Sequence, residues 1–365
     1  MIVYILMAVS ILMMFILSIE EYGYVNKFYA EIDKRCEQDW FVKNWNKGIF
    51  IFFVIYFWLL TAFRGRTIGN DTQNYIIIFK DFCDGPSPSL YVELGFQLFC
   101  SLVGLFSKDP QVFLIVHATV CYVAIAIYCL KYSKNLMFSL IFIFVLCFYD
   151  FTSMLRQALA IIIVMYAYQQ MKNKNDLTAI LMILLASYFH ESAICALILF
   201  AYRLFNCNFW VALVLFVCVC VLSLRGVFTN IIAAIMPRYL WYLSGEYAEG
   251  GLLGNTYYIL RSIVFFAFAY HAYQGNKRKK AEMWLFFCMT IVYCFSFESN
   301  AITRIGAYFF YPMISELPNV FEEGKFKYKG HWQTIISFVM IMFLLFVLKF
   351  RPEWNNLYPY YFWIG

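Results

Sequence analysis

Arginine, acidic and amide side chains crowd the stretch RGRTIGNDTQNY from Arg64 to Tyr75, which directly follows a wholly apolar segment. Arg64 and Arg66 are a pair of guanidiniums, whose planar shape suits bidentate binding of phosphate oxygens. Asp71 lies close by in sequence and is a candidate general base, or a residue that orients an arginine. Asn70 and Tyr75 add hydrogen-bonding groups to the stretch. The pattern indicates binding of an anionic substrate; the alternative is a solvated, charged loop that leaves a membrane.

Three further candidates lie at the ends of apolar segments. Glu93 opens such a segment, which would desolvate it, so it is a second candidate general base; a salt bridge to one of the arginines is an equal alternative. Arg156 is near the start of a predicted helix, where its charge opposes the helix dipole. It is therefore a candidate substrate ligand, with snorkelling to the interface as the alternative. His190 ends an apolar segment and is a third catalytic candidate, or else a helix-end residue whose hydrogen bonds are satisfied.

No metal site is predicted. The sequence contains no HExxH or HxxxH pattern and no CxxC spacing, and such spacings are typical of zinc sites. The twelve cysteines lie mostly inside apolar segments, so we expect small core residues. We predict no cofactor.

The composition indicates an integral membrane protein. Of the 365 residues, 63% are hydrophobic and 14% charged, whereas soluble domains are roughly 45–50% apolar. Apolar runs near the length of a membrane helix recur along the chain, and the alternating pattern of a membrane barrel is absent. We expect an all-α polytopic bundle of about 12 transmembrane helices, over residues 1–19, 48–63, 111–130, 136–149, 156–171, 176–190, 191–205, 209–224, 257–272, 283–298, 304–319 and 331–349. The apolar segment at 91–106 is predicted to be a re-entrant or interfacial helix.

We predict one membrane domain over residues 1–365, oriented by its basic residues. With the N-terminus outside, the cytoplasmic side includes the loop 20–47 and holds 17 basic residues, of which 14 are lysine. The other face holds 11, of which 8 are arginine, and includes the outer loops 64–110 and 225–256. The rule for membrane topology does not explain arginines on this second face.

Arginines at membrane depth usually mark a substrate path or a partner. On the outer face, Arg238 lies in the loop 225–256 and Arg304 at the start of a predicted helix that Pro312 would kink. With Arg64, Arg66 and Arg156 they form a predicted set of ligands for an anion. In a bilayer, lipid phosphate or pyrophosphate is the natural candidate.

A series of short motifs resembles the EpsG-type family of Wzy-like bacterial polysaccharide polymerases. In chain order the motifs are FRGR at 63–66, GNDTQNY at 69–75, ELGF at 93–96, RQALA at 156–160, FHESA at 189–193, RIGAY at 304–308 and the terminal PY at 359–360. The resemblance covers nearly the whole chain. Glu191 and Asn70 depart from the residues expected at those positions.

The resemblance implies a GT-C-like enzyme of the bacterial inner membrane. Such an enzyme moves a growing glycan from undecaprenyl pyrophosphate to a sugar hydroxyl of the next lipid-linked repeat unit, on the periplasmic or extracellular face. We expect metal-independent transfer, in which guanidiniums stabilise the charge of the leaving pyrophosphate. The expected partners are the lipid-linked oligosaccharide, membrane lipids and, as a further candidate, a chain-length regulator, but no nucleic acid.

Two other functions stay open at the level of sequence. An O-antigen ligase-like transferase shares the donor and differs in its acceptor. A transporter or flippase of an anionic lipid-linked oligosaccharide would carry inverted repeats and buried charges at the midplane, whereas the charges here gather at one interface.

Overall fold

A computed structural model describes residues 4–5, 8–13, 15, 35–85, 92–204, 208–227, 230, 252–297, 300–326, 328–352 and 356–363. Within these ranges the chain is helical and forms no strand; one isolated bridge joins Arg64 to Phe362. The predicted all-helical class is therefore confirmed for the described residues. Most of the loop 20–47 and of the loop 225–256 lies outside them, as does Arg238.

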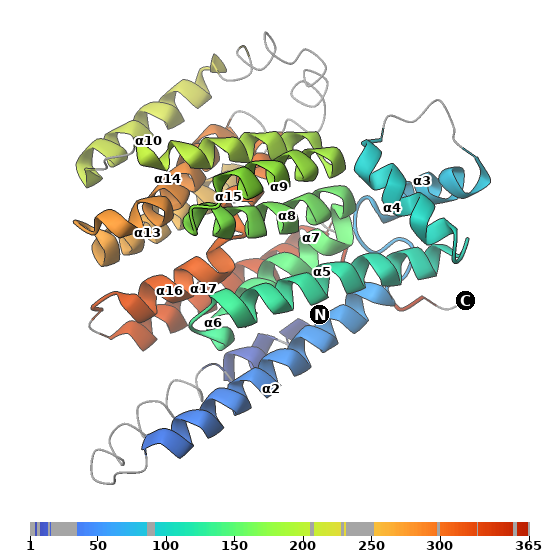
Figure 1. Ribbon diagram of the computed structural model, residues 1–365, viewed down its shortest axis with the longest axis horizontal. Coiled ribbons are helices and arrows are strands. Elements are labelled where there is room, and N and C mark those ends of the chain that lie inside the picture. Colours follow the sequence, from blue (N-terminus) through green and yellow to red (C-terminus); the bar gives the residue numbers. More distant parts are fainter. Residues whose placement is uncertain are drawn as a thin grey trace. The chain divides into compact units, whose positions relative to one another are not determined.

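The helices follow the predicted apolar segments closely (Figure 1). They are α2 (Arg35–Ala62), α3 (Thr72–Asp84), α4 (Leu94–Gly104), α5 (Pro110–Tyr132), α6 (Leu136–Phe142), the π-helix η2 (Ile143–Cys147), α7 (Phe148–Ser153), α8 (Leu155–Lys172), α9 (Asp176–Phe189), the 3-10 helix η3 (Glu191–Arg203), α10 (Phe209–Leu224), α13 (Leu252–Tyr273), η6 (Lys277–Lys279), α14 (Lys280–Cys294), η7 (Phe295–Phe297), α15 (Asn300–Phe310), α16 (Met313–Glu323) and α17 (Lys329–Phe350).

Four helical segments are long and apolar enough to cross a membrane: Asn44–Ala62, Pro110–Tyr132, Leu136–Ser153 and Lys329–Phe350. The third is a continuous rod made of α6, η2 and α7. The described part of the chain is thus helical and, with these four segments, fits a membrane protein, while the number of twelve spans stays a prediction.

One predicted span is interrupted, α2 begins at Arg35 rather than at residue 48, and the segment predicted to be a re-entrant or interfacial helix forms a short helix. The span expected at 304–319 is interrupted between α15 and α16, because Pro312 lacks the backbone N–H that would continue the helix. The apolar segment at 91–106 forms α4, whose 11 residues extend only about 16 Å at the α-helical rise. That is about half of the hydrocarbon core, so α4 is too short to span it.

Local capping explains several helix starts. Asp109 accepts a hydrogen bond from the backbone N–H of Gln111 at 2.9 Å, and Pro110 occupies the first turn of α5. Asn135 caps α6 in the same way through the N–H of Phe138 at 3.0 Å. These caps end the preceding loops at fixed residues and set where the long apolar helices begin.

The chain divides into two compact units, each considered by itself. The first consists of residues 1–162, 188–190 and 326–365. In it, α2 packs along α5 and α6, while α3 and α4 pack on each other and on α5 (Figure 1). This unit carries most of the residues that the sequence predicts to be functional.

The second unit consists of residues 163–187 and 191–325, and α14 packs there against α10, α13, α15 and η3. A buried ionic network connects three of its helices. Lys172 of α8 lies 2.7 Å from Glu316 of α16 and 3.4 Å from Glu282 of α14. The Glu316 side chain is only 1% exposed. A buried carboxylate of this kind depends on its cation, because an unpaired charge in the interior is costly.

Candidate active site

The loop between α2 and α3 is held by the C-terminal segment of the chain. The N–H of Gly65 donates to the carbonyl of Tyr361 at 2.9 Å, and the N–H of Trp363 donates to the carbonyl of Phe63 at 2.9 Å. Tyr361 also covers Gly65 so closely that a side chain there would collide with its ring. The C-terminal segment therefore fixes the course of the arginine-rich loop.

Arg64 is fully buried. Its guanidinium donates to the carbonyl of Thr61 at 2.5 Å and to the carbonyl of Thr152 at 3.3 Å. Burial lowers the pKa of Arg64 to about 10, so it stays charged at neutral pH. Pyrophosphate binding by Arg64 stays a prediction; in this arrangement its side chain has no exposed surface and connects the loop to the turn before α8.

The carbonyl of Thr152 is the fixed point for several parts of the loop. It accepts a second hydrogen bond from Thr72 Oγ1 at 3.0 Å, at the start of α3. Gly69, at φ +88°, packs directly on the same carbonyl, and a side chain there would collide with it. On the other side of the turn, His117 Nε2 lies 3.0 Å from the carbonyl of Leu155. These contacts fix the first residues of α8 and with them Arg156.

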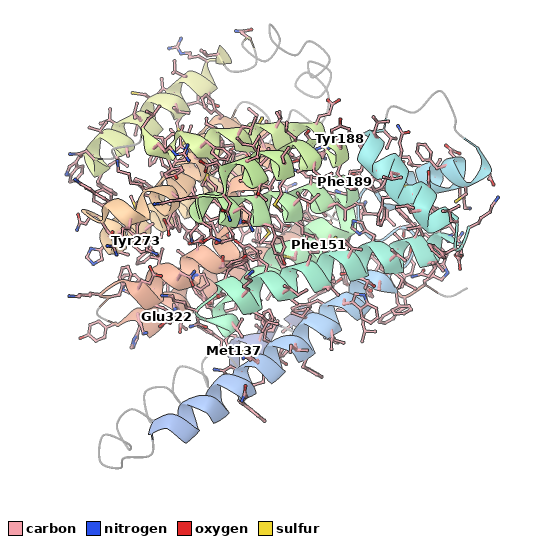
Figure 2. All side chains as sticks on the ribbon, viewed as in Figure 1. Met137, Phe151, Tyr188, Phe189, Tyr273 and Glu322 are labelled. Carbon is pink, nitrogen blue, oxygen red and sulfur yellow. The ribbon has the colours of Figure 1, made fainter. Side chains whose placement is uncertain are left out.

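Gly95 brings the start of α4 against the end of α9. A Cβ added at Gly95 would lie 2.8 Å from the carbonyl oxygen of Tyr188, so only glycine permits this approach. Figure 2 shows Tyr188 and Phe189 beside α4. Glu93 comes just before α4 and His190 just after α9, so the close packing of the two helix ends brings both side chains together.

Glu93, Arg156 and His190 form one cluster, in which the carboxylate of Glu93 serves both partners. Oε2 lies 2.5 Å from Arg156 NH1, and Oε1 lies 3.0 Å from His190 Nδ1. Glu93 is 7% exposed, while Arg156 and His190 are each 22% exposed. The carboxylate is thus covered, and its two partners reach the surface.

The charge state of Glu93 follows from these contacts. Burial by itself raises the pKa of the carboxyl, but the hydrogen bond with His190 and the positive charge of Arg156 outweigh it and lower the pKa to about 2. Because an ionised carboxylate only accepts hydrogen bonds, Nδ1 of His190 carries the proton in this contact. Nε2 of a neutral ring is then available to accept a proton from a substrate.

The predicted alternative for Glu93, a salt bridge to one of the arginines, is confirmed with Arg156 as the partner. Tyr75 is buried, and its ring centre lies 5.9 Å from the Arg156 guanidinium. The sequence predicts both Tyr75 and Arg156 as substrate-binding residues, and the structure brings these two residues together.

The remaining predicted site residues within the described ranges are exposed or half-buried. Arg66 is exposed and its guanidinium stacks 3.9 Å from the ring centre of Trp363. Asn70 is exposed, and Asp71 is half-buried immediately before α3. Arg304 is exposed on α15 in the second unit. Their roles in binding or catalysis stay predictions.

No group of three or more His, Cys, Asp or Glu side chains is arranged to hold a metal ion within the ranges that the structure describes. Metal-independent transfer remains a prediction that activity measurements have to test.

The sequence was also compared with models of known protein families. The sequence model of the EpsG family matches residues 47–362. The chain belongs to the EpsG family. Membership confirms the resemblance seen in the motifs and supports a polysaccharide polymerase-like role in a membrane. No curated protein and no solved structure matches this EpsG-family chain, so the likeness to GT-C enzymes stays a prediction.

Sequence reasoning missed how the candidates of this EpsG-family protein are connected. It chose Glu93 and His190 separately, although they share a hydrogen bond across 97 positions of the chain. The signal was present in Gly95, two residues after Glu93, because a glycine at the start of an apolar helix favours close approach of another backbone. The shared carbonyl of Thr152 had no signal, since a backbone acceptor is the same in every residue.

Proposed function

We propose that this EpsG-family protein is a polysaccharide polymerase that transfers a growing glycan from undecaprenyl pyrophosphate to a sugar hydroxyl of the next lipid-linked repeat unit. The observation that carries the proposal is the buried carboxylate of Glu93, which contacts both a histidine and an arginine whose side chains are partly exposed. Family membership supports the substrate class.

In the proposed reaction, His190 Nε2 takes the proton of the acceptor hydroxyl. The hydroxyl oxygen forms a bond to the anomeric carbon of the donor glycan as the bond from that carbon to the pyrophosphate oxygen breaks. The electron pair of the broken bond leaves with the pyrophosphate. Glu93 accepts the hydrogen bond from His190 Nδ1 and stabilises the imidazolium that forms, which is the role of the carboxylate in catalytic triads.

Arg156 is the proposed ligand of the leaving group. NH1 is held at 2.5 Å by Glu93, Tyr75 also contacts the guanidinium, and the side chain is 22% exposed, so its exposed part is the proposed contact for a phosphate oxygen. A guanidinium fixed before the reaction stabilises the charge that develops on the pyrophosphate. We propose Arg66, Arg238 and Arg304 as further ligands, with Asn70 and Tyr75 as polar contacts to the glycan or pyrophosphate.

Asp71 and Arg64 have proposed roles that do not involve the cluster of Glu93, Arg156 and His190. Asp71 is the competing general base, because it is half-buried at the start of α3. Arg64 is proposed to act on the substrate through the loop that it holds, because its own guanidinium bonds Thr61 and Thr152.

The test uses purified protein in nanodiscs with an undecaprenyl-pyrophosphate-linked repeat unit, and gel analysis of the product. We expect a ladder of glycans from the wild-type protein, its loss in His190→Gln, and its retention in Asp84→Asn. Asp84 is a matched carboxylate control, since its side chain is 75% exposed and lies 3.4 Å from Lys108. Transbilayer movement of the lipid without any ladder would contradict the proposal and favour a transporter. A single added unit on a lipid A core or protein acceptor would favour a ligase.

A further inference from the structure

Arg261 is a buried arginine in the second unit that lies outside the site described so far. It is on α13, about one turn inside the predicted span 257–272, and it is one of the eight arginines on the predicted outer face. Its side chain is 8% exposed, and its Nε atom is buried with no hydrogen-bond partner. A buried cation of this kind calls for a physical explanation.

Four aromatic rings surround the guanidinium, and we call them with Arg261 the aromatic cage. The distances from Arg261 Cζ to the ring centres are 3.7 Å for Phe310, 5.0 Å for Tyr258, 5.3 Å for Tyr257 and 5.5 Å for Tyr293. The rings come from α13, α14 and α15. Within the described residues, the guanidinium contacts these rings and forms no ion pair with a carboxylate.

The cage is rigid and well packed. The rings of Tyr258 and Tyr293 stack with centres 5.6 Å apart, and Tyr293 meets Phe310 edge to face at 6.1 Å. Gly306 of α15 makes room for this arrangement, because a Cβ there would lie 2.9 Å from the Tyr293 ring. The position of the guanidinium is therefore fixed in advance of any ligand.

Aromatic faces offset part of the cost of burying a guanidinium, and the Tyr257 hydroxyl also interacts with it, but its buried Nε–H has no acceptor. An arginine has five such donors, and those left without an acceptor in an interior are costly. The missing partner is a planar or tetrahedral oxyanion, which the guanidinium fork binds in bidentate fashion. The tyrosine hydroxyls of the cage can donate further hydrogen bonds to the same group.

We propose that the aromatic cage is a phosphate-binding site that holds the pyrophosphate of a lipid-linked glycan through Arg261. The choice of this source rests on the proposed function, since a polymerase must hold two lipid-linked units and each carries a pyrophosphate. A phospholipid headgroup offers the same chemistry and is distinguished by experiment.

Binding is measured directly, so that it is independent of catalysis. Undecaprenyl pyrophosphate is titrated into protein held in nanodiscs of zwitterionic lipid, and its binding is followed by native mass spectrometry and by thermal shift. The experiment is repeated with inorganic pyrophosphate and with phosphatidylglycerol as probes. The variants are Arg261→Gln and Arg261→Lys, and Arg225→Gln is the matched control, because Arg225 is an exposed arginine of the same unit.

We expect Arg261→Gln to weaken binding of undecaprenyl pyrophosphate at least about tenfold, Arg261→Lys to weaken it less because a point charge replaces the fork, and Arg225→Gln to have no effect. If Arg261→Gln does not fold, Gly306→Ala tests the same cage by displacing Tyr293 while the charge is kept; it should weaken binding in the same direction. Unchanged affinity in folded Arg261 variants overturns the proposal, as does a loss confined to phosphatidylglycerol. Arg261-dependent binding without a glycan ladder would refute the polymerase function alone; a ladder with unchanged binding in Arg261→Gln would refute the cage alone.

Discussion

Replacing Glu93 by glutamine removes one negative charge from the centre of the Glu93, Arg156 and His190 cluster while keeping the shape of the side chain. The wild-type carboxylate accepts from Arg156 at 2.5 Å and from His190 at 3.0 Å. A glutamine has one acceptor oxygen and one NH₂ group. With its oxygen on Arg156, its NH₂ faces His190 Nδ1, which can accept only in the tautomer that carries the proton on Nε2, and that tautomer cannot act as the base.

The expected loss follows from these contacts. Hydrogen bonds that involve a charged group contribute about 1.5–3 kcal/mol, and each 1.4 kcal/mol corresponds to about a factor of ten in rate. Misorientation of His190 in Glu93→Gln should therefore lower kcat about 10- to 100-fold. Removal of the base itself in His190→Gln should lower kcat about 10²- to 10⁴-fold. KM should change little in either variant, since neither group is assigned to ground-state binding.

The decisive measurement is the double variant Glu93→Gln/His190→Gln. If Glu93 acts mainly through His190, most of its effect disappears once the base is gone, and the double variant should lose little more than His190→Gln, the remainder arising from Arg156, which Glu93 also holds. Initial rates of ladder growth against repeat-unit concentration give kcat and KM for all four proteins, with Asp84→Asn as the control. Size-exclusion profiles and thermal unfolding check the fold. A double-variant loss equal to the product of the two single losses would refute the coupled roles.

Four further outcomes follow from the same structure. Gly95→Ala should separate Glu93 from His190 and lower kcat at least about tenfold, whereas Gly48→Ala should not, because nothing lies within 4 Å of a Cβ added there; equal rates would contradict the role of this contact. The contacts of Glu93 lower its pKa from 4.5 to about 2. The stability that the folded protein gains from this shift is present above pH 4.5 and is lost as pH falls towards 2. The difference in Tm between wild type and Glu93→Gln should therefore be constant from pH 5 to 8 and shrink below about pH 4. Lys172→Met leaves two buried carboxylates without this cation and should destabilise the protein by about 2–4 kcal/mol in detergent unfolding, with partial recovery on adding Glu316→Gln; no change in Tm would argue against the network. Activity should survive EDTA, and loss with EDTA that a divalent ion restores would disprove metal-independent transfer.

Much of the helical pattern could be predicted from the sequence, because apolar run length and breakers are local signals. The observed α10 occupies the predicted residues 209–224, and Pro312 interrupts its helix as expected. Helix starts were harder: α2 begins at Arg35 and not near residue 48. The residues before the apolar run are polar, and hydrophobicity carries no information on whether a polar segment continues a helix.

The candidate site was predicted as a set of residue types, but its connections were not. Arg64 was expected at the substrate because guanidiniums bind phosphate, yet its partners here are the carbonyls of Thr61 and Thr152. Arg66 stacks on Trp363, almost 300 residues away in the chain. Such pairings depend on tertiary packing, which brings distant segments together. Residue type alone cannot distinguish an arginine that waits for a ligand from one that holds a loop.

The electrostatics of the cluster separate Glu93, a leading candidate for the base in the sequence, from His190, which the sequence offered as a third catalytic candidate. A carboxylate whose pKa is about 2 is a weak proton acceptor at neutral pH, since the best general bases have a pKa near the working pH. The same contacts that make Glu93 a weak base make it a strong acceptor from His190 Nδ1, and this leaves Nε2 to take the proton. The arrangement therefore favours His190 as the base and Glu93 as its positioning residue. Arg156 completes this division of roles, because it helps to keep Glu93 ionised through NH1, and the exposed part of its guanidinium is the proposed contact for the leaving phosphate.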